Sequence, residues 1–150
     1  MKIYFDNAAT TQPPRAVFEA MHPVMLEDFG NPSSTHSHGR VVKTIIEEAR
    51  KKVAQLLHCT PGEIFFTSGG TEADNMAIRK SVEDKGVKNI ISSPIEHHAV
   101  SHTIEELAHQ GKVKMHLVNL LPNGHINLTH LEELLAAHPN ALVSLMHANN

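Results

Sequence analysis

The fold is decided at IFFTSGGTEADN, residues 64–75. Three apolar residues typical of a buried strand lead into Gly69-Gly70, and an acidic segment typical of a helix follows from Thr71. Glycine lets the backbone approach a ligand closely, because no Cβ is in the way. A helix start has unpaired N–H groups and a partial positive charge. The stretch therefore indicates either a phosphate site or an ordinary tight turn, in which Thr71 caps the helix and Asp74 completes a capping box.

Composition limits the classes of function. The chain has 150 residues, enough for one domain with a core, and a net charge of −3 without a basic stripe, which disfavours nucleic acid as a partner. No apolar run reaches the roughly 20 residues that a membrane helix needs, so no membrane partner is expected. The N-terminus has no apolar segment of a signal peptide. A single cysteine, Cys59, fits a reducing compartment, and we predict a cytoplasmic protein.

The chain is rich in histidine, with 13 residues, but their spacing does not indicate a metal site. No HExxH motif is present, and a single cysteine cannot form CxxC. His98 and His102 lie four residues apart on an expected helix, yet a third and a fourth ligand are lacking. We therefore expect no bound metal.

Hydrophobic periodicity predicts alternating strands and helices. Strands are expected at residues 64–67, 89–92, 113–118 and 142–147. Helices are expected from about Pro13, with a kink or break at Pro23, and over residues 40–58, 71–84, 97–110 and 128–137. Asn127 is expected to cap the last helix, and Asn123-Gly124 to form a turn. This order predicts an α/β fold with a mostly parallel sheet and helices on both faces.

Ligands of such sheets bind at the carboxyl ends of the strands. Three loops are expected there, at residues 68–71, 94–97 and 148–150. Their convergence favours a ligand site at Gly70-Thr71. The stretch matches neither GxGxxG nor GxxxxGK[ST], so a Rossmann-type nucleotide binder is disfavoured.

The motifs YFDNAATT, FGNPSS, IFFTSGGTEADN, IEHHAV and LVSLMHANN occur here in order. Their order and spacing resemble the first two-fifths of the cysteine desulfurases, which are class V aminotransferase relatives with the fold type I of pyridoxal 5′-phosphate (PLP) enzymes. The resemblance implies that residues 1–12 are an N-terminal arm on the small-domain side. Residues 13–150 would then be the N-terminal part of the PLP-binding large domain, with the C-terminal remainder absent.

The resemblance also implies roles for single residues. Gly70 and Thr71 would bind the cofactor phosphate at a helix N-terminus. At Gly70 the backbone N–H would matter more than a side chain, since the family often has Ala or Cys at this position. His97 would stack on the pyridine ring and would be the catalytic residue for proton transfer. Asn150 would donate a hydrogen bond to the phenolic oxygen of the cofactor.

The implied activity is conversion of L-cysteine to L-alanine, with sulfur transferred to an enzyme cysteine as a persulfide. That sulfur would serve iron–sulfur cluster assembly or another sulfur pathway. Homodimerisation and a sulfur-accepting partner, such as an iron–sulfur scaffold protein, are also implied.

Several functional residues of the family are not found in these 150 residues. No Ser-His-Lys occurs for the Schiff-base lysine, and Cys59 does not match the catalytic loop. The pyridine-nitrogen aspartate and the substrate arginine are also missing, so the segment alone is expected to be inactive. A selenocysteine lyase or another class V enzyme stays open as an alternative. So does a truncated, non-catalytic scaffold or partner-binding fragment.

Overall fold

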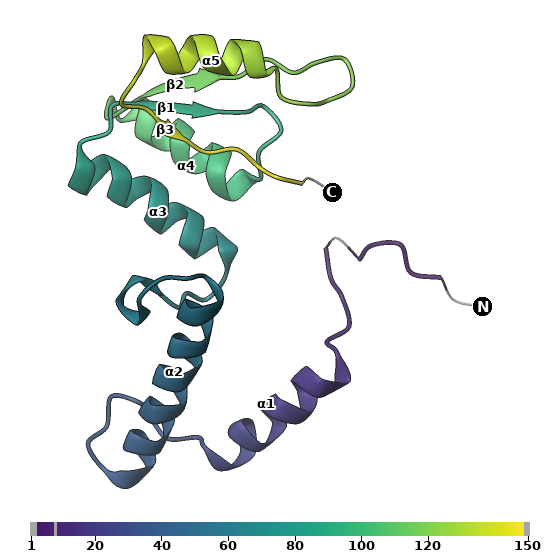
Figure 1. The fold of residues 1–150 in the computed structure, drawn as a ribbon, viewed down its shortest axis with the longest axis vertical. Coiled ribbons are helices and arrows are strands. Elements are labelled where there is room, and N and C mark those ends of the chain that lie inside the picture. Colours follow the sequence, from purple (N-terminus) through teal and green to yellow (C-terminus); the bar gives the residue numbers. More distant parts are fainter. Residues whose placement is uncertain (1–2, 8, 149–150) are drawn as a thin grey trace. The chain divides into compact units, whose positions relative to one another are not determined.

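The computed structural model describes residues 3–7 and 9–148, and it divides into two compact units, Met1–Phe66 and Thr67–Asn150. Each unit is described by itself (Figure 1). No helix among the described residues is both long and apolar enough to cross a membrane.

The first unit is helical. It contains α1 (Arg15–Glu27), α2 (Ser37–Leu56) and a single 3-10 turn, η1 (Pro61–Glu63). α1 continues through Pro23, so the predicted break is wrong; a proline removes only one backbone hydrogen bond, and the following turn continues to Glu27. α2 begins three residues earlier than predicted, because the His36 side chain caps its first turn by accepting from the Gly39 N–H.

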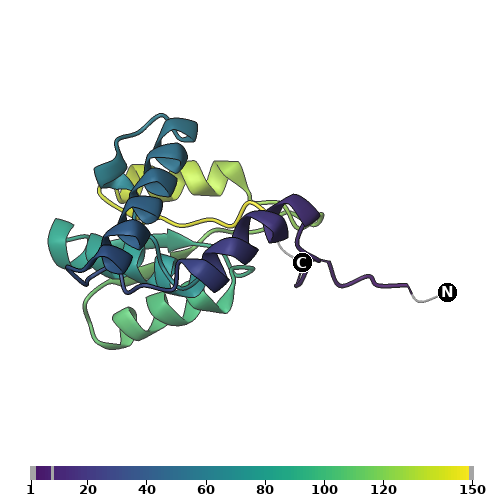
Figure 2. The same cartoon turned by 90° about the horizontal axis from the view of Figure 1, so that it is seen from below.

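The second unit alternates helices and strands. Its elements are α3 (Gly70–Lys85), β1 (Asn89–Ser92), α4 (His98–His109), β2 (Lys114–Leu117), α5 (Leu128–Ala137) and β3 (Leu142–Val143). The sheet has the order β2-β1-β3, and both strand pairs are parallel. α4 and α5 lie on opposite faces of this sheet (Figures 1 and 2). The predicted α/β class with a parallel sheet between helices is confirmed.

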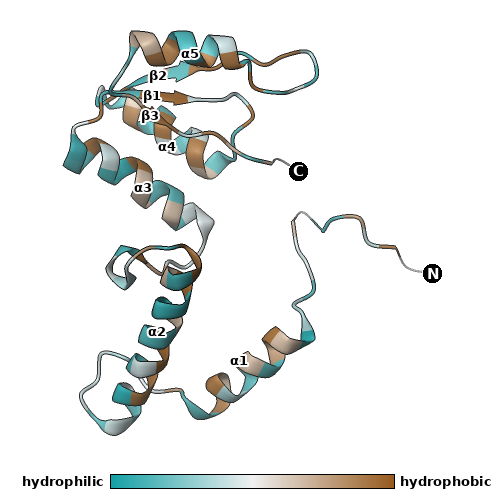
Figure 3. Cartoon of the chain, in the orientation of Figure 1, coloured by the Kyte–Doolittle hydropathy of each residue, from teal (hydrophilic) through white to brown (hydrophobic). Residues whose placement is uncertain are grey.

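One hydrophobic cluster holds the second unit together. It joins α3, α4, β1 and the residue before β2 through the buried side chains Ile78, Val82, Ile90, Val100, Ile104, Leu107 and Val113. β1 is the central strand, and its Ile90 and Ile91 are fully buried, in agreement with the hydrophobic residues that Figure 3 colours brown. The core therefore fixes β1, and with it the loop that follows β1.

The strand predicted at residues 64–67 is not formed. Phe65 and Phe66 are 70% and 53% exposed, and the three strands of the described sheet pair only with one another. The apolar run has strand composition, but an extended segment becomes a strand only when a neighbour supplies backbone hydrogen bonds. Instead, Arg50 of α2 donates to the Ile64 carbonyl and lies over the Phe66 ring.

The other expected elements are present with shifted ends. The strand expected at 142–147 has only two residues, Leu142 and Val143, although the Ser144 N–H still donates to the Ile91 carbonyl. Gly86 ends α3 in the left-handed conformation. The Asn127 side chain caps α5 by accepting from the His130 N–H, as predicted.

Candidate functional site

The first turn of α3 begins at Gly70, with Gly69 as its N-cap. The capping box of Thr71 and Asp74, which belonged to the tight-turn alternative, is not formed. Glu72 instead reaches back to Ser68, accepting its N–H at 2.7 Å and its hydroxyl at 2.8 Å. Glutamate at the third helical position commonly reaches back in this way, because its side chain is long enough to span the turn.

This arrangement leaves the first turn of α3 open. The Ser68 N–H, followed by the Ser68 hydroxyl, lowers the pKa of Glu72, so this carboxylate stays charged and holds the loop. The N–H groups of Gly70 and Thr71 have no acceptor within the helix, since they precede its first complete turn. A Cβ added at Gly70 would meet nothing within 4 Å. A ligand can therefore approach this backbone closely.

His97 is the N-cap of α4, so this helix begins at His98, one residue later than predicted. Its Nδ1 accepts the Ala99 N–H at 3.0 Å. Nδ1 must be unprotonated in this bond, so in the neutral imidazole the proton lies on Nε2. The ring itself is exposed. α4 thus orients an imidazole whose Nε2 and faces remain available.

Thr71 and His97 line the same surface depression. Its volume is about 400 Å³, and its other lining residues come from the facing sides of α3 and α4, among them Asn75, Arg79, His102 and Thr103. The starts of α3 and α4 lie near each other because β1 connects the two helices. α3 precedes β1 in the chain, and α4 follows β1. The structure therefore brings together two of the predicted site residues.

Glu96 joins the loop after β1 to the segment after β3. Its Oε1 accepts the Met146 N–H at 2.6 Å and the Ser93 hydroxyl at 3.2 Å. A second depression, of about 300 Å³, is lined by Ile95 and by residues 146–148. Asn150, predicted to contact the cofactor, lies outside the described residues.

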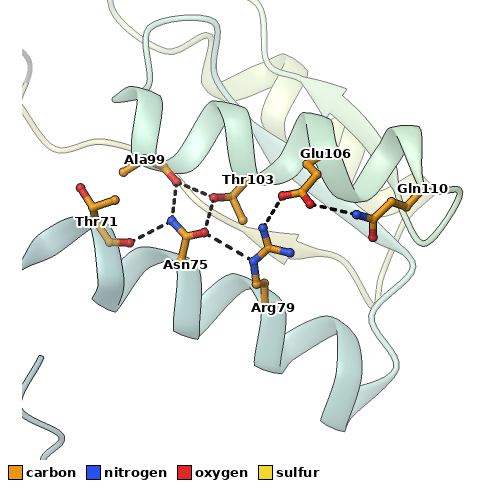
Figure 4. A network of polar contacts seen from close by, with 7 residues as sticks. All are labelled: Thr71, Asn75, Arg79, Ala99, Thr103, Glu106 and Gln110. Carbon is orange, nitrogen blue, oxygen red and sulfur yellow. Dashed lines mark hydrogen bonds and ion pairs between the residues drawn. The ribbon is translucent and has the colours of Figure 1, made fainter.

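Asn75 is a residue that sequence reasoning missed. Its side chain makes hydrogen bonds to both α3 and α4, as Figure 4 shows. The only signal in the sequence is its position four residues after Thr71, on the same side of the helix as that residue. Within the described residues, no group of three or more potential metal ligands is found.

The family description "Aminotransferase class-V" matches residues 3–150. The chain belongs to the class-V aminotransferase family. Its curated relatives include the cysteine desulfurase IscS of Dictyoglomus turgidum, 43% identical, and that of Methanosarcina thermophila, 46% identical. Each alignment covers 99% of this chain but only 38% and 37% of the relative. The chain spans about two-fifths of the length of these relatives.

Solved structures agree with this membership of the class-V family. A NifS-like protein superposes with a TM-score of 0.89 at 40% identity, covering 99% of this chain and 41% of that one. SspA, in a structure described as a complex with cysteine, superposes with a TM-score of 0.80 at 34% identity, covering 97% of this chain and 42% of its own. The chain therefore has the fold of the fold type I PLP enzymes.

Proposed function

We propose that this chain forms the cofactor-facing part of a PLP-dependent cysteine desulfurase. The observation that carries the proposal is the shared depression of Thr71 and His97, which runs between α3 and α4 and includes both helix starts. One helix start offers open N–H groups to an anion, and the other offers an exposed imidazole to a planar ring. The cysteine desulfurases among the relatives support the reaction class.

The first turn of α3 fits the phosphate of PLP. Its N–H groups are directed out of the helix, and the helix dipole favours an anion at this end. Thr71 is exposed, and in Figure 4 its carbonyl faces Asn75 while the rest of the residue lies away from the network. Gly70 leaves room for the phosphate, since no atom occupies the space of its missing Cβ. These residues would hold the cofactor at its phosphate.

His97 fits the ring of the cofactor. The bond from the Ala99 N–H to Nδ1 fixes the imidazole at the start of α4. Nδ1 is thereby occupied, so the ring exchanges a proton with a substrate only through Nε2. PLP supplies an electron sink that stabilises negative charge on the substrate. His97 would keep the ring plane aligned and move one proton.

The proposal includes L-cysteine as substrate, with L-alanine as product and an enzyme persulfide as the sulfur carrier. It also includes Asn150 as a donor to the phenolic oxygen of PLP. A homodimer and a sulfur-accepting protein, such as an iron–sulfur scaffold, complete it. For the finer statements the support is the resemblance in motifs and the SspA structure described with cysteine.

The complete natural protein, incubated with PLP and reduced with borohydride, tests the proposal. We expect one stable adduct on a single lysine, located by intact mass and peptide mapping, and alanine and persulfide formed from L-cysteine before reduction. A complete protein that takes up no PLP, or one that binds it without releasing alanine, would contradict the proposal. Release of alanine from selenocysteine alone would identify a selenocysteine lyase instead.

Two variants of the complete protein separate the roles of the site residues. Thr71→Val should mainly weaken PLP retention, because it removes one hydrogen bond to the phosphate. His97→Ala should weaken ring stacking and slow turnover by about 100-fold or more, the usual size of a general acid–base contribution. Near-normal alanine formation by His97→Ala would remove His97 from catalysis.

A further inference from the structure

Asn75 uses the full hydrogen-bonding capacity of its side-chain amide. Its Nδ2 donates to the Thr71 carbonyl at 2.9 Å and to the Ala99 carbonyl at 3.3 Å. Its Oδ1 accepts from the Thr103 hydroxyl at 2.8 Å and from the Arg79 Nε at 3.4 Å. Two carbonyl acceptors on one side fix which end of the amide is nitrogen.

The bonds of Asn75 reach both halves of the proposed cofactor site (Figure 4). Thr71 belongs to the first turn of α3, the proposed phosphate cradle. Ala99 belongs to the first turn of α4, and its N–H donates to the His97 ring while its carbonyl accepts from Asn75. A single side chain therefore connects the cradle to the residue that orients the imidazole.

The hydrogen bonds of Asn75 form the more buried part of the polar network between α3 and α4. Thr103 is only 4% exposed, and its hydroxyl lies 2.8 Å from both the Asn75 Oδ1 and the Ala99 carbonyl. The outer part of the network, in which Arg79 pairs with Glu106, is more exposed. Exposed ion pairs contribute little to stability, so this outer part cannot replace the amide.

Helix packing by itself does not require Asn75. α3 and α4 are already joined by the buried side chains of Ile78, Val82, Val100, Ile104 and Leu107. That contact is non-directional and tolerates small shifts of one helix along the other. The hydrogen bonds of Asn75 are directional, and two of them act on the first turns of the helices, at the Thr71 and Ala99 carbonyls.

We propose that Asn75, supported by Thr103, is a positioning residue that sets the placement of Thr71 relative to His97, so that one cofactor contacts both. The inference rests on the proposed function. Asn75→Asp keeps the shape of the side chain but replaces Nδ2, with its two N–H donors, by an oxygen that faces the two carbonyls. Asn75→Leu removes all four hydrogen bonds at similar volume.

The test measures PLP affinity of the complete apoprotein by absorbance titration, without turnover. Asn75→Leu and Asn75→Asp should weaken binding about tenfold or more, from loss of several hydrogen bonds that hold the site. The decisive readout is a double-mutant cycle. Thr71→Val and His97→Ala should each cost clearly less affinity in the Asn75→Leu background than in the wild type, because neither contact is then correctly placed.

Asn89→Leu is the matched control. Asn89 is also a partly buried asparagine, bonded to His116 of another element at 3.0 Å, but it lies at the amino end of β1, away from the carboxyl-end loops. This variant should lower thermal stability while leaving the cost of Thr71→Val unchanged. If Asn75→Leu does not fold, Thr103→Val removes only the hydrogen bonds of the Thr103 hydroxyl, to Asn75 and to the Ala99 carbonyl, and should lower PLP affinity less. Thr103→Ser retains the hydroxyl and should have the wild-type affinity.

Equal costs of Thr71→Val and His97→Ala with and without Asn75 would overturn the inference and leave the proposed function intact. Failure of Thr103→Ser to restore the affinity lost in Thr103→Val would also overturn it. A wild-type apoprotein that binds no PLP would overturn the inference together with the proposed function.

Discussion

Gly70 offers a direct test of the backbone contact proposed for the phosphate. It is the first residue of α3, where proline fits because its N–H has no helical acceptor and its fixed φ suits the helix. Gly69 before it is extended, with φ 169° and ψ 178°, a conformation compatible with a following proline. Gly70→Pro should therefore keep the fold but remove one N–H from the cradle.

We expect Gly70→Pro to weaken PLP binding by roughly 10- to 100-fold, because a hydrogen bond to a charged group contributes about 1.5–3 kcal/mol. Gly70→Ala is the control, since its Cβ meets no atom within 4 Å and its N–H is retained. Titration of both apoproteins with PLP gives the comparison. Equal affinities would mean that the Gly70 N–H does not contact the phosphate.

At the residue scale, the sequence indicated which candidate residues lie at helix starts, because chain order positions them there. Gly70 and Thr71 lie at the start of α3 and His97 lies between β1 and α4, and the order of elements brings Thr71 and His97 to one depression. Asn75 and Thr103 were missed because they meet across two helices, 28 residues apart. Periodicity describes which face of a helix is apolar, but it does not specify which polar side chains pair between helices.

At the scale of elements, Glu96 connects the loop after β1 to the segment after β3. Glu96→Ala should lower stability by about 1–3 kcal/mol, because the Met146 N–H loses its charged acceptor. Glu96→Gln keeps an acceptor oxygen and should recover most of the loss. Thermal unfolding of the three proteins provides the measurement, and a fully stable Glu96→Ala would mean that this contact is dispensable.

His116 on β2 gives the second unit a pH dependence. Burial, followed by the positive charges of His138 and Lys114, lowers the pKa of His116 below 6.5. The unfolded chain then binds a proton more readily than the folded one, so stability is intact above pH 6.5 and declines as the pH falls through the lowered pKa. The His116 ring stacks on His138 with centroids 4.0 Å apart, which brings the two charges together.

His116→Gln should reduce the fall in melting temperature between pH 7.5 and about pH 5. His125→Gln, at an exposed position on the turn before α5, is the control and should leave that fall close to the wild-type value. An unchanged pH dependence in His116→Gln would show that the proton uptake of His116 does not couple to folding.

Strands were predicted correctly where an apolar segment also has neighbouring strands with which it can pair. The Asn89–Ser92 strand is confirmed because its apolar residues lie between two parallel neighbours. The run at 64–67 has similar composition but no paired strand, so its phenylalanines remain exposed. Composition indicates that a segment can be a strand, whereas pairing decides whether it is one.

At the scale of the whole molecule, burial is unevenly distributed between the two units. In the described part of the first unit only Gly39 and Ala54 are buried, and α1 has no buried residue. Large apolar side chains of α1, such as Phe18 and Met25, are 58% and 71% exposed. The second unit contains the hydrophobic cluster around α4 and β1. Stability of this chain should therefore be concentrated in the second unit.

Native-state hydrogen exchange on the 150-residue chain tests that expectation. α1 and α4 have 13 and 12 residues, so helix length does not separate them, but α4 buries Ala99, Val100, Thr103, Ile104 and Leu107. Amides of α4 should exchange at least about 100-fold more slowly than those of α1, because local opening of a helix without buried contacts costs little. Equal protection of both helices would mean that a surface covers α1 in solution, and that the division of stability argued from burial is wrong.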